Sequence, residues 1–217
     1  VVSDEIEVKY IDKVAPTIGT ISLDPNDWTK NAVTVTVPAT DIGVNEILYK
    51  MDNGEWQTSN EFTIKDNVIH KFYVKDSLGN ENTVPAEIKA DKYDDKAPVI
   101  NSLTPNTTEW VPDEIVITVD ATDAGVQGIA YKLGANGTWQ SENTFTVTTN
   151  GKYQVYVKDA LGNEIATPSE IEINNIDKTN PEIVDFTSTT EEWTNSDVVI
   201  SGTVKDTQSG VKKLQYK

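Results

Sequence analysis

The sequence predicts an all-β protein made of tandem antiparallel β-sandwich repeats, each of about 82 residues. Three observations support this prediction. Sequence landmarks return at a nearly fixed interval, short runs alternate hydrophobic with polar residues, and tight-turn dipeptides separate those runs. Alternation with a period of two is typical of a half-buried strand, and several short strands at regular spacing are typical of a sandwich.

The internal repeat is visible in segments where Asp-Lys is followed closely by proline. Asp12, Asp95 and Asp177 each precede a lysine, and they are separated by 83 and 82 positions. The motif Lys-Asp-x-Leu-Gly-Asn occurs at 75–80 and again at 158–163. Self-similarity at a constant interval indicates repeated structural units. We therefore expect the last strand of a preceding repeat at 1–11, complete repeats at 12–94 and 95–176, and the first half of a further repeat at 177–217.

In chain order, each complete repeat is expected to contain about seven short strands. The clearest strands alternate Val or Ile with polar residues, at 33–37 and 115–119, and a later strand follows the same pattern in each repeat. Asn-Gly and Gly-Asn dipeptides between these runs are typical of hairpin turns. No segment has a helical period. The residues expected to be buried are Val33, Val35, Val37, Tyr49, Phe72 and Val74 in the first repeat, and Ile115, Ile117, Val119, Tyr131, Val155 and Val157 in the second.

The segment 177–217 is expected to form only three strands. A three-stranded sheet with one uncovered apolar face is marginally stable. We expect the missing strands to be supplied by a continuation of the chain or by a neighbouring copy. The apolar residues that would lack a facing sheet are Val198, Ile200, Val204, Leu214 and Tyr216.

Composition excludes several classes of function. The net charge is −17, and all basic residues are lysine, so the surface repels phosphate backbones and lacks arginine for base recognition. There is no cysteine for a disulfide, a thiolate metal site or a thiol nucleophile. No apolar run is long enough to span a membrane, and no signal segment opens the chain, so we expect any anchor to lie outside these 217 residues.

A resemblance to known domains rests on four sequence features. The segment 150–155, with Tyr153 two residues before Val155, resembles the strand-F corner of immunoglobulin domains, where a tyrosine bonds back to the chain. The three others are the Asp-Lys-x-x-Pro opening, the Ala-Thr-Asp…Gly-Val turn at 39–44 and 121–126, and the Val-Lys-Asp-x-Leu-Gly-Asn hairpin. Together these three are similar to the bacterial immunoglobulin-like repeats of large surface proteins. This resemblance covers the whole chain. It implies immunoglobulin-like sandwiches in a stalk, spacer or adhesive array that is secreted or on the cell surface.

Catalysis is not expected. The chain has one histidine, His70, which occupies the tyrosine position of the first repeat, and we interpret it as structural. Nucleophilic catalysis needs a base beside a serine or cysteine, and the second repeat has no histidine. Neither repeat carries an insertion that would form a cleft around paired carboxylates. We therefore expect this chain not to be an enzyme.

Aspartates recur where the loops of an immunoglobulin-like sandwich converge. The entering linker, the B–C loop and the F–G loop lie at one end of such a sandwich. Clustered carboxylates suit calcium, which takes about 6–8 oxygen ligands and stiffens domain arrays at cadherin junctions. Alternatively, each aspartate caps its own turn or pairs with a neighbouring lysine. The candidate calcium ligands are Asp12, Asp41 and Asp76 in the first repeat, Asp95, Asp123 and Asp159 in the second, and Asp177 and Asp206 in the third.

The tryptophans allow two interpretations. A flat indole ring can stack on a sugar, or it can close one end of its own sandwich. Because tryptophans recur at fixed positions before strand B, at 28, 110 and 193, the structural interpretation is favoured. Trp56 and Trp139, which follow a hairpin turn, are the candidate ligand-binding residues.

The function that these observations favour is mechanical. Short linkers without Gly/Ser-rich tracts favour a non-catalytic spacer that holds a distal domain away from the cell, with neighbouring repeats as its partners. The alternative is a binding module for surface glycans or a host protein. A spacer should bind neither, whereas the module should lose binding when Trp56 or Trp139 is replaced by alanine.

Overall fold

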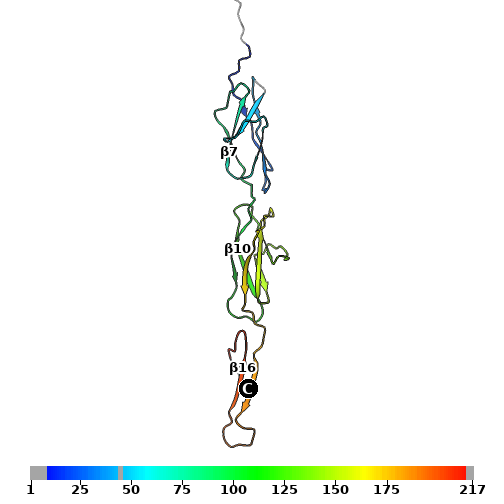
Figure 1. The fold of residues 1–217 in the computed structure, drawn as a ribbon, viewed down its shortest axis with the longest axis vertical. Helices are drawn as coiled ribbons and strands as arrows, with labels where there is room; N and C mark the ends of the chain where they lie inside the picture. The colour runs from blue at the N-terminus through cyan, green and yellow to red at the C-terminus, as the bar shows by residue number, and fades with distance from the viewer. Residues whose placement is uncertain (1–8, 44–45, 214–217) are drawn as a thin grey trace, which may run out of the picture. The chain divides into compact units, whose positions relative to one another are not determined.

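The computed structural model describes residues 9–43 and 46–213, and every regular element in these ranges is a β-strand (Figure 1). None of the described residues forms a helix with the length and hydropathy needed to span a bilayer. Two compact units are present. The first contains the described residues up to Ala97 with two loops, Asp123–Gly128 and Asp159–Asn163, and the second contains the other described residues.

The first unit contains two three-stranded antiparallel sheets and a short strand pair. One sheet has the order β2-β3-β6, the other has the order β5-β7-β8, and β1 pairs with β4. Its strands are β1 (Thr17–Ile18), β2 (Ser22–Asp24), β3 (Val33–Thr36), β4 (Ala39–Thr40), β5 (Ile47–Met51), β6 (Glu61–Ile64), β7 (Ile69–Asp76) and β8 (Ala86–Lys89).

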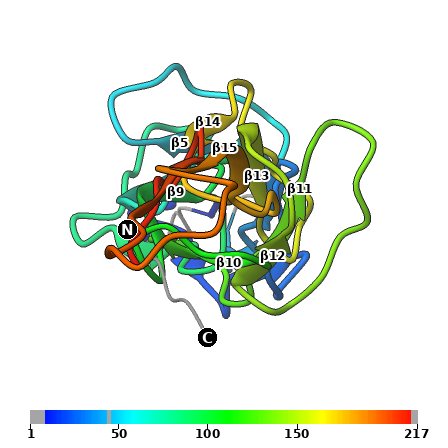
Figure 2. The ribbon, with the colours of Figure 1, turned by 90° about the horizontal axis from the view of Figure 1, so that it is seen from below.

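The second unit contains an equivalent pair of sheets. One has the order β12-β10-β9 and the other has the order β11-β13-β14. Figure 2 shows β10 beside β12, and β13 between β11 and β14. Their strands are β9 (Val99–Pro105), β10 (Ile115–Thr122), β11 (Ala130–Leu133), β12 (Thr144–Val147), β13 (Gly151–Lys158) and β14 (Ser169–Ile173).

The strand order is that of an immunoglobulin-like sandwich. In each unit the strand equivalent to B pairs with E, while F lies between C and G in the facing sheet. Alternation along the strands fills the space between the sheets, because every second side chain of β3, β7, β10 and β13 points inward. All twelve residues expected to be buried have exposed fractions of 9% or less. The predicted fold class is therefore confirmed.

The tyrosine corner expected in the second repeat is present. The Tyr153 hydroxyl donates a hydrogen bond of 2.6 Å to the carbonyl oxygen of Thr149, four residues earlier. This contact fixes the turn that enters β13 and so places Val155 and Val157 in the core.

A short parallel pairing holds the segment that leaves each sandwich. The Thr29 amide donates to the Lys92 carbonyl at 2.9 Å, and the Asp94 amide donates to the Thr29 carbonyl at 2.9 Å. At the corresponding place in the second repeat, the Asp177 amide donates to the Val111 carbonyl at 2.8 Å. These bonds position the backbone of Asp94 and Asp177.

The last segment forms an antiparallel pair of strands, β15 (Glu182–Ser188) and β16 (Ile200–Lys205). Its apolar side chains are largely uncovered, as expected: Val198 and Ile200 are exposed and Val204 is half-buried. Leu214 and Tyr216, from the third expected strand, lie outside the described residues. The source of any covering strands stays a prediction.

Candidate metal centre

In the first repeat, the three predicted aspartates each cap a turn with one carboxylate oxygen. Oδ1 of Asp12 accepts the Val14 amide at 2.9 Å, and Oδ1 of Asp41 accepts the Gly43 amide at 3.0 Å. Oδ1 of Asp76 accepts the Asn80 amide at 2.8 Å. Aspartate favours such turns because its short side chain reaches the backbone two or more residues ahead. The turn-capping alternative is thus correct for one oxygen of each residue.

These aspartates come together from three separate segments. One carboxylate oxygen from each of Asp12, Asp41 and Asp76 lies within 4.8 Å of the others. Asp76 is fully buried, and the two other side chains are half-buried. Oδ2 of Asp12 and Oδ2 of Asp41 are buried without a hydrogen-bond partner. A buried carboxylate oxygen without a partner is costly, so this arrangement favours a bound positive charge.

An equivalent group is formed later in the chain by Asp94, Asp123 and Asp159, with the same 4.8 Å limit. Their Oδ1 atoms accept the amides of Lys96, Gly125 and Asn163 at 3.0, 2.8 and 2.8 Å. Oδ2 of Asp123 is buried without a partner. Oδ2 of Asp94 accepts the Val126 amide at 2.9 Å, so this carboxylate also holds the loop after β10.

The prediction of Asp95 as a ligand was wrong by one position. Asp94, not Asp95, lies four residues before the linker proline, as Asp12 does in the first repeat, and its side chain points into the group. Asp95 instead pairs with Lys96 at 2.9 Å, and this ammonium group holds the pKa of Asp95 below its ordinary value.

Sequence reasoning missed two positioning asparagines. Nδ2 of Asn80 donates to Oδ2 of Asp76 at 2.6 Å and to the Asp12 carbonyl at 3.4 Å. Asn163 makes the same two contacts in the second repeat, with Asp159 at 2.6 Å and the Asp94 carbonyl at 3.1 Å. The recurring Asp-x-x-Gly-Asn motif is the sequence signal that could have identified these asparagines.

Hydrogen bonding also affects the titration of Asp76. Burial of its carboxyl raises the pKa, but the Asn80 side chain and the amides of Leu78, Gly79 and Asn80 outweigh it and lower the pKa. Asp76 is therefore charged at neutral pH, although it is buried.

Two glycines allow the linker carboxylate to enter each group. A Cβ atom at Gly43 would overlap the Asp12 carboxylate, and a Cβ at Gly125 would overlap that of Asp94. Sequence reasoning described this segment only as a turn. The overlap explains why a glycine follows each B–C loop aspartate by two positions.

In the third segment, the two predicted aspartates are not part of a group of three acidic residues within the described ranges. Asp177 is buried, and its oxygens accept from Thr179 Oγ1 at 2.6 Å and from the Ser209 amide at 2.9 Å. These hydrogen bonds hold the pKa of Asp177 well below its usual range. Oδ1 of Asp206 accepts the Gln208 amide at 2.9 Å.

The lysines that neighbour the groups in sequence point to other partners. The Lys75 ammonium lies 4.5 Å from the centre of the Trp56 ring, and Lys50 lies 4.6 Å from it. In the second repeat, Lys158 and Lys132 both lie 4.5 Å from the Trp139 ring. These are cation–π contacts. Lys75 and Lys158, the lysines that directly precede Asp76 and Asp159, thus each contact an indole ring.

These contacts also describe the two candidate ligand-binding tryptophans. Trp56 and Trp139 are half-buried, and lysine occupies part of each ring face. The expectation that the other tryptophans close the ends of their sandwiches was wrong for Trp110, and it stays a prediction for Trp193, because only two strands of that sandwich are described. Trp110 is 44% exposed, and Trp193 is fully exposed.

The geometry of the aspartate groups fits one divalent cation each. At ligand distances of about 2.3–2.6 Å, two oxygens on opposite sides of one calcium ion lie about 5 Å apart. Oxygens that all lie within 4.8 Å of one another meet this limit. Three carboxylates supply part of the coordination shell, and backbone carbonyls or waters complete such shells in proteins.

Comparison with known proteins assigns no family to the chain. No family model matches the chain, and no curated protein matches it. Among solved structures, it is similar to the chicken CNTN1 FN1-FN3 domains, with 13% sequence identity and a TM-score of 0.34, over 85% of this chain and 74% of that chain. A similarity this low says nothing about a ligand.

Proposed function

We propose that this chain is a non-catalytic extracellular spacer of immunoglobulin-like repeats whose aspartate groups bind calcium. The observation that carries the proposal is the recurrence of the same three carboxylates in both repeats, with oxygens within 4.8 Å of one another and some of them buried without a partner. Recurrence at equivalent positions favours a shared role over chance placement of acidic residues.

The linkers support a mechanical role. The segments between β8 and β9 and between β14 and β15 contain no glycine or serine, and each ends near a proline. Flexible linkers are rich in Gly and Ser, so this composition favours stiff connections. Bound calcium would fasten the linker aspartate, Asp12 or Asp94, to two loops of the following repeat. The location outside a bacterial cell rests on the sequence resemblance.

The lining of one groove in the first unit supports a non-catalytic role. A groove of about 530 Å³ beside β1 is lined by residues 15–18 and 81–86, and Glu81 is its only titratable side chain. Acid–base catalysis needs a positioned proton donor or acceptor with a suitable pKa, and hydrolysis of glycosides needs a pair.

The calcium proposal is tested by titration calorimetry of protein first treated with EDTA. We expect two sites, one of which is lost in Asp41→Asn and the other in Asp123→Asn. Asp113→Asn, an exposed carboxylate in the loop before β10, is the matched control and should keep both. At a calcium concentration 100 times Kd, each site should stabilise the folded state by about 2.7 kcal/mol.

Magnesium provides a second control, because it prefers a smaller octahedral shell and should bind more weakly. The proposal fails if calcium produces no binding heat and the melting temperature is the same in calcium and in EDTA. A spacer also predicts no retention on glycan arrays. Retention that is lost in Trp56→Ala would favour the binding-module alternative.

A further inference from the structure

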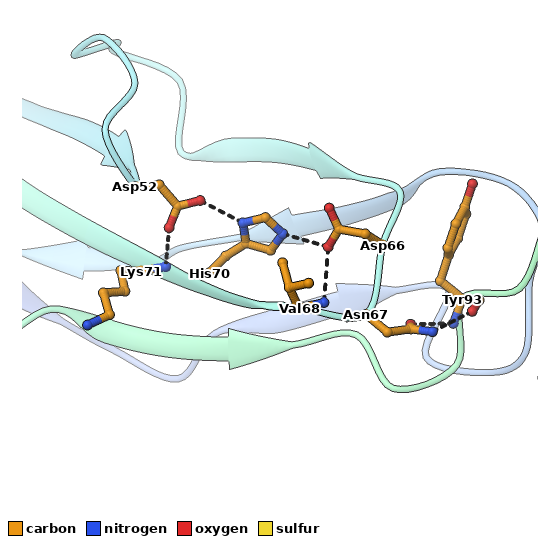
Figure 3. Close-up of polar contacts among 7 residues, drawn as sticks. All are labelled: Asp52, Asp66, Asn67, Val68, His70, Lys71 and Tyr93. Carbon is orange, nitrogen blue, oxygen red and sulfur yellow. Dashed lines mark hydrogen bonds and ion pairs between the residues drawn. The ribbon is translucent and has the colours of Figure 1, made fainter.

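His70 lies between two carboxylates from different turns of the first repeat (Figure 3). Its Nδ1 is 2.7 Å from Oδ2 of Asp52, and its Nε2 is 2.9 Å from Oδ1 of Asp66. Asp52 begins the turn after β5, and Asp66 lies in the turn between β6 and β7. The histidine is buried, and its side chain has an exposed fraction of 10%. One side chain therefore joins two turns that follow different strands of the repeat.

Proton counting determines the charge of this ring. An ionised carboxylate only accepts hydrogen bonds, and a neutral imidazole has one N–H donor and one acceptor nitrogen. Both ring nitrogens of His70 contact carboxylate oxygens. The neutral ring would place a nitrogen lone pair against an oxygen, so the observed geometry needs the imidazolium form. In agreement, burial lowers the pKa of His70, but the hydrogen bonds to Asp52 and Asp66 outweigh burial and raise it.

The two carboxylates are not held equally. The Asp52 amide donates to the Lys71 carbonyl at 2.7 Å, and its Oδ1 accepts the Lys71 amide at 2.8 Å, which leaves Oδ2 for His70. Asp66 uses the single atom Oδ1 for both His70 and the Val68 amide. The Asp66 side chain is also more exposed than that of Asp52, at 49% against 41%. When the ring has lost one proton, we therefore expect it to keep its hydrogen bond to Asp52 and to lose the one to Asp66.

We propose that protonated His70 is a clamp that ties the Asp66 turn to the Asp52 turn, and that loss of one ring proton releases Asp66. The charged residues of the adjacent strand β8 form ion pairs with other groups. Ile88 lies across from His70 in the β7–β8 pair. The residues on either side of Ile88, Glu87 and Lys89, form separate ion pairs. These are Lys71 with Glu87 at 3.2 Å and Lys89 with Asp91 at 2.7 Å.

The release should be confined to the turn. Beside Asp66, the Asn67 side chain exchanges two hydrogen bonds with the Tyr93 backbone, at 2.7 and 3.1 Å, and these do not involve a titrating group (Figure 3). The second repeat has no such clamp, since Tyr153 occupies the equivalent position and bonds to the neutral Thr149 carbonyl.

The direction of the pH effect follows from linkage. A histidine whose pKa is raised in the folded state stabilises that state fully below the unfolded value of about 6.5. This contribution is lost as the pH rises through the folded value. The first repeat should thus be more stable in mild acid, by about tenfold in the folding equilibrium constant for each unit by which the pKa is raised.

The experiment uses the chain's one histidine, whose ring protons give a single titrating set in NMR. Measurements in EDTA keep the result independent of the calcium proposal. We expect the midpoint of the His70 ring titration to lie above pH 6.5. The chemical shift of the Val68 amide should change with the same midpoint, and that of the Lys71 amide should change less. Asp66→Asn should move the midpoint down, and Asp24→Asn, an exposed carboxylate of β2, should not.

Stability provides the second measurement. His70→Tyr, which copies the second repeat, should remove the dependence of first-repeat stability on pH between about 6 and 8. A midpoint at or below 6.5, or an unchanged midpoint in Asp66→Asn, overturns the proposal even if His70→Tyr does not fold.

Discussion

At the scale of single residues, the fit between a glycine and a carboxylate decides whether each aspartate group can form. Asp94 reaches the group only because Gly125 has no side chain. Gly125→Ala should force the loop or the carboxylate to move, at a cost of about 1–3 kcal/mol typical of overpacking. Gly19→Ala is the matched control, since its added Cβ would meet Pro38 at an ordinary contact distance of 3.4 Å.

Urea denaturation of both variants measures this difference. Calcium binding at the second site should weaken in Gly125→Ala only. Equal stability of the two variants would show that Asp94 is not held against Gly125.

Residue identity was also where sequence reasoning reached its limit. In the second linker the Asp-Lys landmark selects Asp95, which directly precedes Lys96, whereas the distance of four residues to Pro98 selects Asp94. The buried residues of the strands were easier to predict, because period-two alternation places each side chain on a definite face of the sheet. The cluster depends on loop conformation, and Asn80 and Asn163 act through contacts that sequence spacing does not show.

At the scale of elements, the outer face of the sheet formed by β11, β13 and β14 carries a stack of aromatic rings and lysines. The Lys132 ammonium lies 4.5 Å from the centre of the Trp139 ring and 4.6 Å from the centre of the Tyr156 ring. The Lys158 ammonium also contacts Trp139, at 4.5 Å from the ring centre. The hairpin after β11 is thereby packed on its own sheet. The sequence indicated the hairpin, but alternation alone could not show that its tryptophan folds back.

Trp139→Ala should therefore lower stability. Two cation–π contacts of about 0.5–1 kcal/mol each, together with the half-buried ring, give an expected loss of about 1–3 kcal/mol. Trp193→Ala removes a fully exposed ring and should change the stability little. Thermal unfolding followed by circular dichroism compares them. Similar melting temperatures for both variants would mean that the stack contributes nothing.

At the scale of the whole molecule, the described residues contain separate hydrophobic cores in the two units. In the first unit, one core gathers around Phe72 and Val35, while Ile117 and Val155 belong to the clusters of the second. Because each core is filled by its own sheets, each should lose stability independently. The repeat in the sequence made this prediction possible, since it assigns every core strand to one sandwich before any contact is known.

Core truncations test this independence. Phe72→Ala should destabilise the first unit by about 3–5 kcal/mol, and Ile117→Ala should destabilise the second by about 2–5 kcal/mol. Native-state amide exchange reports each unit separately. We expect Phe72→Ala to reduce protection in β3 and β7 and to leave β10 and β13 unchanged. Equal loss of protection in both units would show that they unfold as one cooperative body.

The parallel pairing of the exit segments has a consequence for tension along the chain. A pull along the Lys92–Asp94 segment acts across the two hydrogen bonds that this segment shares with Thr29. Bonds that lie across the direction of pulling are sheared together, whereas a hairpin opened from its end gives way one bond at a time. The same pairing recurs between Val111 and Ile176. Each repeat thus ends in a pair of backbone hydrogen bonds that resists extension of the chain.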